Sequence, residues 1–375
     1  MNVIHICYSL DNNGINHLLT SVYSLLKNKS NKTTYKIIIL YVGLSKNQIN
    51  LIKSLSKNRN GVSFSFINCY DFCEKYKIAD YKKTFDNQLF KFYTKLKWPL
   101  PMFFYYFLPE ILPVSIDKVI YLDIDTLILK DLSKLYNLKI NTSIAGVSCY
   151  DLAYVIKRQN FLNNFGALRE YIPSWPGFED KDITKYENII NSGVILINFK
   201  KFIKKFDTQE KIKNLFQKNK EWGYPDQELL AKIFQKDITL IDVKYNFQVH
   251  FFADNFLESS FSVYDLSIEK LKNFISWVNI IHYTVRPKPE EFFNVTTFNI
   301  IKKIGIRNFW LLLYNPLIDR DFEINDNDNK KMIELGIIYR SYFSPFSTKT
   351  RIYELSFFIY FKTWFMMANE YKIYE

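Results

Sequence analysis

The first 70 residues alternate predominantly apolar runs with segments of helical periodicity, and this order limits the fold more than any other feature. The runs "NVIHICYS" (2–9), "YKIIILYVG" (35–43) and "VSFSFINC" (62–69) are predicted strands. The segments 15–28 and 45–58 between them have the apolar spacing of helices. Strands without polar alternation are typical of a parallel sheet that helices cover on both faces. We therefore predict a nucleotide-binding type of α/β layer.

The α/β pattern continues through the middle of the chain. "PDQELLAKIF" (225–234) is a predicted helix with Pro225 near its first turn, where a missing N–H is tolerated. Neither GxGxxG nor GxxxxGK[ST] occurs, so the dinucleotide fingerprint and the P-loop are excluded. Near residue 300 the pattern fades, and we divide the chain into an α/β domain over 1–295 and a helical extension over 296–375. The further predicted strands are 119–125, 143–151, 188–202, 238–247 and 278–289.

The chain is basic, with a formal net charge of +12, which is typical of proteins with an anionic partner. A composition rich in Lys, Asn, Ile, Phe and Tyr can have the same charge without such a partner, so we give the charge little weight. Its lysines are dispersed and no nucleic-acid recognition motif is present, so we expect no nucleic acid among the partners. The four cysteines form no CxxC pair, and we expect them to be reduced, as in a cytosolic protein. There is no signal-peptide pattern and no apolar run long enough to span a bilayer, which favours a cytoplasmic location.

The C-terminal segment "RIYELSFFIYFKTWFMMANEYKIY" (351–374) has a separate, aromatic and basic character. Wound as a helix, it places polar side chains on one stripe, into which Phe358 and Phe365 intrude. One alternative is a helix docked on the core of the domain. The other is a helix that lies in a membrane interface, so that residues 340–375 make a peripheral contact with an anionic membrane. The stripe consists of Arg351, Glu354, Lys362, Asn369 and Lys372.

Two aspartates directly follow an apolar run in "VIYLDID" (119–125), with Ile124 between them. On a strand, residues i and i+2 project to the same side, so Asp123 and Asp125 would converge at the carboxyl end of a parallel strand. Ligands of open α/β folds bind at that edge. Neighbouring carboxylates repel each other unless a cation lies between them, and Mn²⁺ or Mg²⁺ prefers oxygen ligands that it shares with phosphates. The alternative is a pair of exposed carboxylates on a loop.

Four motifs occur in the order "VIYLDIDTLILKDL", "INSGVILINFKKF", "YPDQELL" and "IIHYTVRPKP". Together they resemble the retaining glycosyltransferases of family 8, which include bacterial lipopolysaccharide galactosyl- and glucosyltransferases. The resemblance covers roughly residues 1–290. It implies a GT-A fold, in which helices cover both faces of a mixed, mainly parallel sheet. It also implies a UDP-hexose donor and Mn²⁺ or Mg²⁺ as the cofactor.

The resemblance assigns a metal site and a phosphate contact. Asp123 and Asp125 match the family's metal-binding D-x-D, and His282 in "IHYT" matches its third metal ligand. Lys288 in "RPKP" matches a lysine that pairs with the donor diphosphate. Without the resemblance, His282 is interpreted as a hydrogen-bonded core residue and Lys288 as a solvated loop residue. The residues themselves leave both alternatives open.

The resemblance also implies contacts to the rest of the donor. Asn191 in "NSGV" matches a residue that hydrogen-bonds the donor sugar. Asp226 matches a carboxylate that binds sugar hydroxyls, and Gln227 an amide on the reacting face of the anomeric carbon, so both are candidate catalytic residues. The alternatives are a plain strand entry for Asn191 and polar residues at a helix N-terminus for the other two. Further candidate donor-binding residues, at turns, are Ser9, Asp11, Asn13 and Ile124.

Some positions depart from the family pattern. The family usually has an arginine in the aromatic segment before the D-x-D strand, where this chain has Tyr106. After His282, the family usually has a glycine at the place of Val285 and a tryptophan at the place of Glu290. Arg286 restores a positive charge near the expected diphosphate loop. The three expected metal ligands are not affected.

The resemblance implies Mn-dependent transfer of galactose or glucose with retention, which forms an α-linkage. The expected acceptor is a glycan or glycolipid such as the core of lipopolysaccharide or lipooligosaccharide. The basic charge and the aromatic tail suit an enzyme at the cytoplasmic face of the inner membrane. Two alternatives are a weak or inactive UDP-sugar-binding module, and a family member that uses a protein or glycogen-like acceptor.

Overall fold

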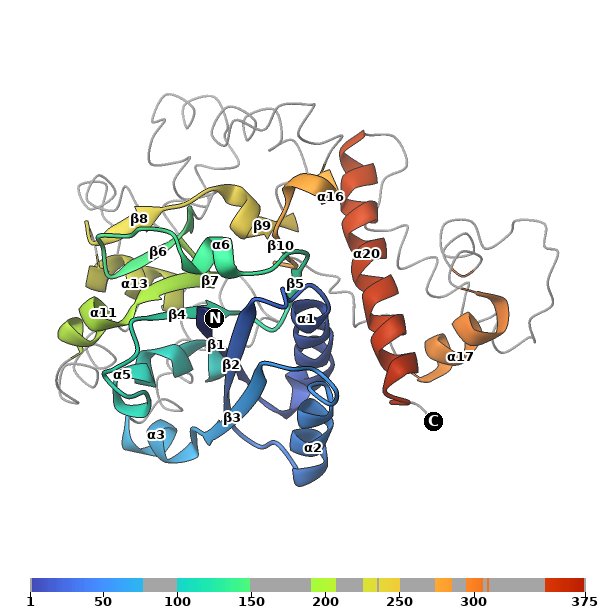
Figure 1. The fold of residues 1–375 in the computed structure, drawn as a ribbon, viewed down its shortest axis with the longest axis horizontal. Coiled ribbons are helices and arrows are strands. Elements are labelled where there is room, and N and C mark those ends of the chain that lie inside the picture. The colour runs from blue at the N-terminus through green and yellow to red at the C-terminus, as the bar shows by residue number, and fades with distance from the viewer. Residues whose placement is uncertain are drawn as a thin grey trace, which may run out of the picture.

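A seven-stranded sheet runs through the computed structural model and carries helices on both faces (Figure 1). The strand order is β3-β2-β1-β4-β7-β6-β8. The structure describes residues 2–76, 100–148, 190–206, 225–234, 236–249, 274–284, 295–305, 309 and 348–373. The strands of this sheet are β1 (Asn2–Leu10), β2 (Thr33–Tyr41), β3 (Val62–Asn68), β4 (Lys118–Leu122), β6 (Ile144–Ser148), β7 (Ile190–Asn198) and β8 (Ile238–Leu240).

The sheet is mixed and mainly parallel, which confirms the predicted fold class. β1 pairs in parallel with β2 and β4, β2 with β3, and β6 with β8. β7 is antiparallel to both of its neighbours, β4 and β6. Because β1 and β4 run in parallel with Tyr8 beside Leu122, the turns that follow these two strands lie at one edge of the sheet.

Two apolar cores lie on the two faces of the sheet. The first is built around α1 (Ile15–Lys27) and the face of β1 that carries Ile4, Ile6 and Tyr8. The second contains the aromatic 3₁₀ helix η2 (Leu100–Phe107), whose rings pack against Cys7 and neighbouring strand residues. The remaining helices include α2 (Lys46–Ser54), α3 (Tyr70–Lys75), α5 (Leu108–Ile111), α6 (Ser133–Tyr136), α11 (Phe199–Lys205), α13 (Pro225–Phe234), α16 (Phe274–Trp277) and α17 (Val295–Ile304).

A second, three-stranded sheet has the order β5-β10-β9, with β5 at Thr126–Ile128, β10 at Ile280–His282 and β9 at Phe247–Gln248. β10 is antiparallel to β5 and parallel to β9. His282 therefore pairs with Thr126, the residue directly after the D-x-D motif. This small sheet brings two segments that are far apart in sequence to one place.

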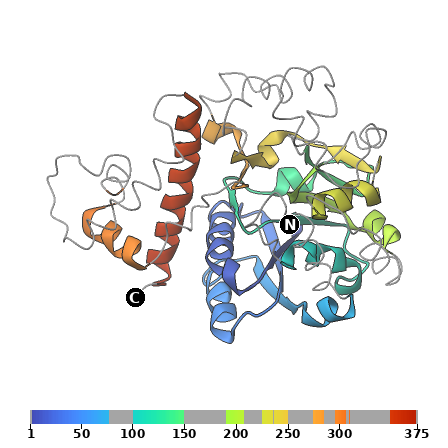
Figure 2. The same cartoon turned by 180° about the vertical axis from the view of Figure 1, so that it is seen from behind.

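The C-terminal helix α20 (Thr348–Glu370) lies beside α1, and Figure 2 shows the same pair from behind. Tyr360 and Trp364 of α20 belong to the first core, and His17 Nδ1 is 3.2 Å from the Tyr360 hydroxyl. The docked alternative for the tail is therefore the observed arrangement of α20. A membrane contact through 340–375 and the boundary at 295 stay predictions. In the described part of the chain, no helix combines the length and apolarity that a membrane crossing requires.

Candidate functional site

Asp123 and Asp125 lie in a tight turn between β4 and β5. β4 ends at Leu122, and the backbone N–H and hydroxyl of Thr126 both donate to the Asp123 carbonyl oxygen, at 3.3 and 2.7 Å. The expectation that strand alternation makes the two carboxylates converge is therefore wrong in detail. The Thr126 bonds close a turn, and the turn brings the two side chains together. Ile124, between them, packs against the first core.

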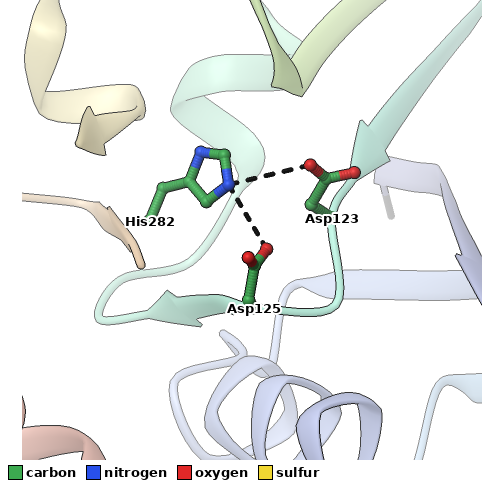
Figure 3. Close-up of side chains that lie close together, drawn as sticks. All are labelled: Asp123, Asp125 and His282. Carbon is green, nitrogen blue, oxygen red and sulfur yellow. Dashed lines mark ion pairs between the residues drawn. The ribbon is translucent and has the colours of Figure 1, made fainter. Parts of the chain in front are cut away.

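His282 at the end of β10 completes a compact group with both aspartates (Figure 3). Its Nε2 lies 3.3 Å from Asp125 Oδ1 and 3.7 Å from Asp123 Oδ2. One ligand atom from each residue lies within 4.8 Å of the others. The side chains of His282 and Asp125 are 4% and 9% exposed, whereas that of Asp123 is 33% exposed. Two carboxylate oxygens and an imidazole nitrogen suit Mn²⁺, and the exposed side leaves room for a ligand from a substrate.

The Asp123 carboxylate is held by a tyrosine from the strand before it. The Tyr121 hydroxyl donates to Asp123 Oδ1 at 2.9 Å, which leaves Oδ2 toward His282. Since that proton is used, Ser9 must be the donor in its 2.6 Å contact with the Tyr121 oxygen. Ser9 is thus placed behind a metal-ligand candidate, at a buried position on β1.

Asp11 and Asn13 follow β1 at the edge of the sheet that also carries the D-x-D turn. Asp11 Oδ1 accepts from the backbone N–H of Asn13 at 2.9 Å and caps the 3₁₀ helix η1 (Asn12–Gly14). This contact is ordinary turn chemistry, and the partly exposed carboxylate keeps a second oxygen for another donor. Gly14 brings this turn against the D-x-D turn, since a Cβ at Gly14 would lie 2.3 Å from Ile124 Cδ1.

Asp226 and Gln227 open α13 after Pro225, as expected for that helix, and both side chains are buried. Burial raises the pKa of Asp226 to about 7; a hydrogen bond from Ser192 opposes the rise, and the charge of Asp123 adds to it. The Tyr106 hydroxyl donates to the Asp226 carbonyl oxygen at 2.9 Å. Where the family usually has a cation, this chain therefore has a neutral phenol that fixes the helix N-terminus.

Asn191 in β7 lies between Gln227 and the group formed by Asp123, Asp125 and His282. Its Nδ2 donates to Gln227 Oε1 at 3.1 Å, and its Oδ1 accepts from Asn246 Nδ2 at 2.8 Å. The Asn246 Oδ1 in turn lies 3.0 Å from His282 Nδ1. The structure thus brings Asn191 next to Gln227, whereas Lys288 lies outside the described residues, together with Val285, Arg286 and Glu290.

Sequence reasoning missed two residues of this site, Asn246 and Gly193. Asn246 is fully buried, and nothing in the sequence distinguishes it from the other polar residues of the stretch 238–247. The Gly193 carbonyl accepts from the Asp123 N–H at 2.8 Å, and a Cβ at Gly193 would lie 2.0 Å from His282 Cε1. A glycine inside a buried strand is the signal for such a close approach.

Comparisons with known proteins agree with the family that the four motifs indicate. The family model described as "Glycosyl transferase family 8" matches residues 5–289. A putative glycosyltransferase of Haemophilus influenzae is 25% identical over 252 residues, which are 65% of this chain and 63% of the relative. The lipopolysaccharide 1,2-glucosyltransferase of Escherichia coli is 24% identical over 149 residues, 40% of this chain and 39% of the relative. These matches span less than two thirds of either relative.

Solved structures share the fold at low sequence identity. Galactosyltransferase LgtC, in a complex with donor and acceptor sugar analogs, has a TM-score of 0.50 and 17% identity; the match covers 93% of this chain and 99% of LgtC. The bifunctional glycosyltransferase WbbM has a TM-score of 0.56 and 18% identity, over 77% of this chain and 47% of WbbM. The fold is therefore that of the GT-A glycosyltransferases.

Proposed function

The chain belongs to glycosyltransferase family 8, and on this premise we propose that it transfers galactose or glucose from a UDP-hexose to a glycan hydroxyl with retention of configuration. The convergence of Asp123, Asp125 and His282 at the sheet edge carries the proposal. A divalent ion held there, Mn²⁺ in our proposal, supplies a positive charge that stabilises the departing diphosphate. Asp123, the most exposed of the three ligands, marks the side from which the donor enters.

The residues around this group have separate proposed roles. Asn191 and Asp226 bind hydroxyls of the donor sugar, and Lys288 pairs with the diphosphate. Asp11 and Asn13 contact the uracil and ribose, with Ser9 beside them, and Ile124 is a further donor-binding residue. The charge state of Asp226 matters, because its ionised form only accepts hydrogen bonds, at both oxygens, whereas its protonated form donates one.

Gln227 faces the anomeric carbon in our proposal and stabilises positive charge there. Its Oε1 already accepts a hydrogen bond from Asn191, which lowers its nucleophilicity further below that of a carboxylate. We therefore propose a front-face reaction, in which the acceptor hydroxyl attacks from the side of the leaving group and an α-linkage forms. Trapping of a glycosyl adduct on Asp226 in the native enzyme would contradict this route.

A UDP-release assay tests the activity. UDP-glucose, UDP-galactose and their N-acetylated forms are compared with Mn²⁺, with Mg²⁺ and with EDTA, and we expect release from one hexose donor that requires the ion. Asp125→Asn should abolish release, since one ligand loses its charge, and calorimetry should show that Mn²⁺ no longer promotes UDP uptake. Uptake of UDP-hexose without any release would favour the inactive binding module instead. Uptake that is independent of Mn²⁺ would contradict the metal site.

We propose a glycolipid acceptor of the lipopolysaccharide or lipooligosaccharide type, and a place at the cytoplasmic face of the inner membrane. The name of the Escherichia coli relative and the net charge of +12 support this proposal. Acceptor screening with lipid-linked core oligosaccharides, a protein and glycogen separates this class from the alternatives. Transfer to glycogen or protein alone would replace the glycolipid proposal.

A further inference from the structure

An unbroken series of hydrogen bonds joins the candidate metal ligand His282 to the candidate reacting residue Gln227. It runs from His282 Nδ1 to Asn246 Oδ1 (3.0 Å), from Asn246 Nδ2 to Asn191 Oδ1 (2.8 Å), and from Asn191 Nδ2 to Gln227 Oε1 (3.1 Å). All four side chains are buried. The four residues come from different parts of the fold: His282 from β10, Asn246 from the segment before β9, Asn191 from β7 and Gln227 from α13.

The direction of every bond follows from one backbone group, the N–H of Gly193. This N–H lies 3.0 Å from Asn191 Oδ1, and a backbone N–H can only donate. The oxygen of Asn191 therefore faces Gly193, so the atom of Asn246 that contacts it must be the donor, Nδ2. The Asn246 oxygen is then the atom that faces His282. A reversed Asn246 amide would place two oxygens against each other and is excluded.

This direction determines the tautomer of His282. Because Nδ1 faces the oxygen of Asn246, Nδ1 carries a proton, and in the neutral ring Nε2 therefore presents its lone pair. Nε2 is the atom directed at Asp123 and Asp125, at 3.7 and 3.3 Å. A neutral imidazole with its lone pair toward the ligand cluster is the form that binds a divalent ion, and partners of the opposite ring nitrogen normally fix it.

The same hydrogen-bond directions also determine the orientation of the Gln227 amide. Its oxygen faces the Nδ2 of Asn191, so its nitrogen is on the other side of the amide group. The orientation of the proposed reacting residue is thus set by the bonds that set the metal ligand. Asn246, 0% exposed, is the member that contacts the metal-ligand side and the sugar side at once.

We propose that Asn246 is a positioning residue that couples the metal ligand to the reacting face. It fixes the Nδ1–H tautomer of His282 and, through Asn191, the orientation of Gln227. The proposal rests on the proposed function for the role of Gln227, whereas the tautomer of His282 can be tested without any reaction. If Asn246 were only a packing residue, its substitution would change stability alone.

Two substitutions separate the two ends of the series. Asn246→Asp keeps an oxygen that accepts the Nδ1–H of His282, but it cannot donate to Asn191. Asn246→Leu has a similar size and makes neither bond. Asn279→Asp is a matched control, because Asn279 is a buried asparagine just before β10 and its backbone bonds to Leu129 and Lys244 are kept in the variant.

The first measurement is the tautomer of His282 in the metal-free protein, by ¹⁵N–¹H correlation NMR. We expect the Nδ1–H form in the wild type, in Asn246→Asp and in Asn279→Asp, and a mixture of forms in Asn246→Leu. Mn²⁺ titration followed by EPR should show an affinity about 10- to 100-fold lower in Asn246→Leu. Asn246→Asp should bind Mn²⁺ at least as well as the wild type.

The second measurement is UDP release with Mn²⁺ at saturation. We expect kcat of Asn246→Asp to fall about tenfold with KM for the donor unchanged. The reason is that this variant no longer fixes, through Asn191, the orientation of the Gln227 amide. An unchanged tautomer and Mn²⁺ affinity in Asn246→Leu would overturn the proposal at the histidine end. An unchanged kcat in Asn246→Asp would overturn it at the Gln227 end. If Asn246→Leu fails to fold, Asn246→Asp alone tests the proposal. A wild-type Mn²⁺ affinity together with a lowered kcat would support it.

The outcomes of this experiment are distinct from failure of the proposed function. A wild type that binds no Mn²⁺ and releases no UDP would refute the proposed function. The NMR comparison would still show whether Asn246 fixes the tautomer of His282.

Discussion

Gly193 contacts three residues of the candidate site through its backbone and its missing side chain. Its carbonyl binds the N–H of Asp123, its N–H sets the amide of Asn191, and its missing side chain leaves room for the ring of His282. Three of the proposed roles therefore depend on one backbone position. No charged group is involved, so the dependence is purely one of space and hydrogen bonding.

Gly193→Ala should displace the imidazole of His282, since the new Cβ would lie 2.0 Å from Cε1 and 2.6 Å from Nδ1. We expect the Mn²⁺ affinity to fall at least about tenfold, as for other losses of ligand orientation. The matched control is Gly146→Ala in the same sheet, where the new Cβ would meet the Ile190 side chain at 2.7 Å. The control should lose stability and keep the wild-type Mn²⁺ affinity; equal loss of affinity in both variants would contradict the specific role of Gly193.

Asp226 should make the stability of the protein depend on pH. Its pKa is raised from 3.8 to about 7, so between these values the folded state holds a proton that the unfolded state has lost. Stability should therefore fall as the pH rises from about 4 to about 7, by at most about 1.4 kcal/mol per pH unit. Urea unfolding in EDTA should show this fall in the wild type and not in Asp226→Asn. Parallel pH profiles of the two proteins would contradict the raised pKa.

At the scale of elements, apolar periodicity was enough to predict the strands that build the sheet. The runs 2–9 and 35–43 correspond to β1 and β2, which contribute buried residues to both cores, and the run 62–69 corresponds to β3, an edge strand whose side chains are partly buried or exposed. The antiparallel direction of β7 could not be predicted, since it depends on pairing with β4 and β6 and not on its own residues. Periodicity describes one segment, whereas direction is a property of a pair.

The candidate site, too, could be predicted only in part from the sequence. Family motifs led to Asp123, Asp125 and His282, which the structure brings together. The turn that closes at Thr126 was missed, because the strand pattern was extended through the aspartates. Asn246 was missed because its importance comes from its neighbours in space, which lie 36 and 55 residues away in the sequence.

The N-terminus of α2 offers a test of stability that does not involve the site. Ser45 and Gln48 form a capping box, in which Ser45 Oγ accepts from the Gln48 N–H and Gln48 Oε1 accepts from the Ser45 N–H. Ser45→Ala should lower the free energy of unfolding by about 1 kcal/mol, through loss of a partner for a helix N–H. Urea unfolding measures this value, and UDP release should stay at the wild-type rate. A change in release would show that α2 is coupled to the site.

At the scale of the whole molecule, α20 supports the segment that carries His282. Tyr283 follows His282 directly, and its ring packs edge-on against Tyr360 of α20, with centroids 4.9 Å apart. Tyr360 also contacts His17 of α1. The tail is thus part of the framework behind the candidate metal site, and its removal would disturb the core as well as any membrane contact.

Tyr360→Ala should therefore act on the core and on the metal site together. Removal of a fully buried ring next to Tyr283 should lower the free energy of unfolding by about 3–5 kcal/mol. It should also weaken Mn²⁺ binding, because the backing of His282 is lost. Phe357→Ala on the same helix is the control, since Phe357 is equally buried in the first core. Equal Mn²⁺ affinities in the two variants and the wild type would show that α20 does not support the site.

A membrane contact must accordingly be tested without deleting the helix. Lys362 is exposed on α20, and Lys362→Glu reverses a charge while the buried face stays intact. If the tail contacts an anionic membrane, this variant should co-sediment less with vesicles that contain anionic lipid, by a free energy of about 1 kcal/mol per basic charge removed. Equal co-sedimentation of wild type and variant would contradict a contact through this face.

The small sheet β5-β10-β9 has a consequence for how the protein is made. Asp125 leaves the ribosome 157 residues before His282, and the helix that backs His282 follows only at Thr348–Glu370. A nascent chain can therefore carry the D-x-D turn long before it can hold an ion firmly. Acquisition of the proposed ion should be a late event in biogenesis, and a prematurely terminated chain should be metal-free even where the first strands are already in place.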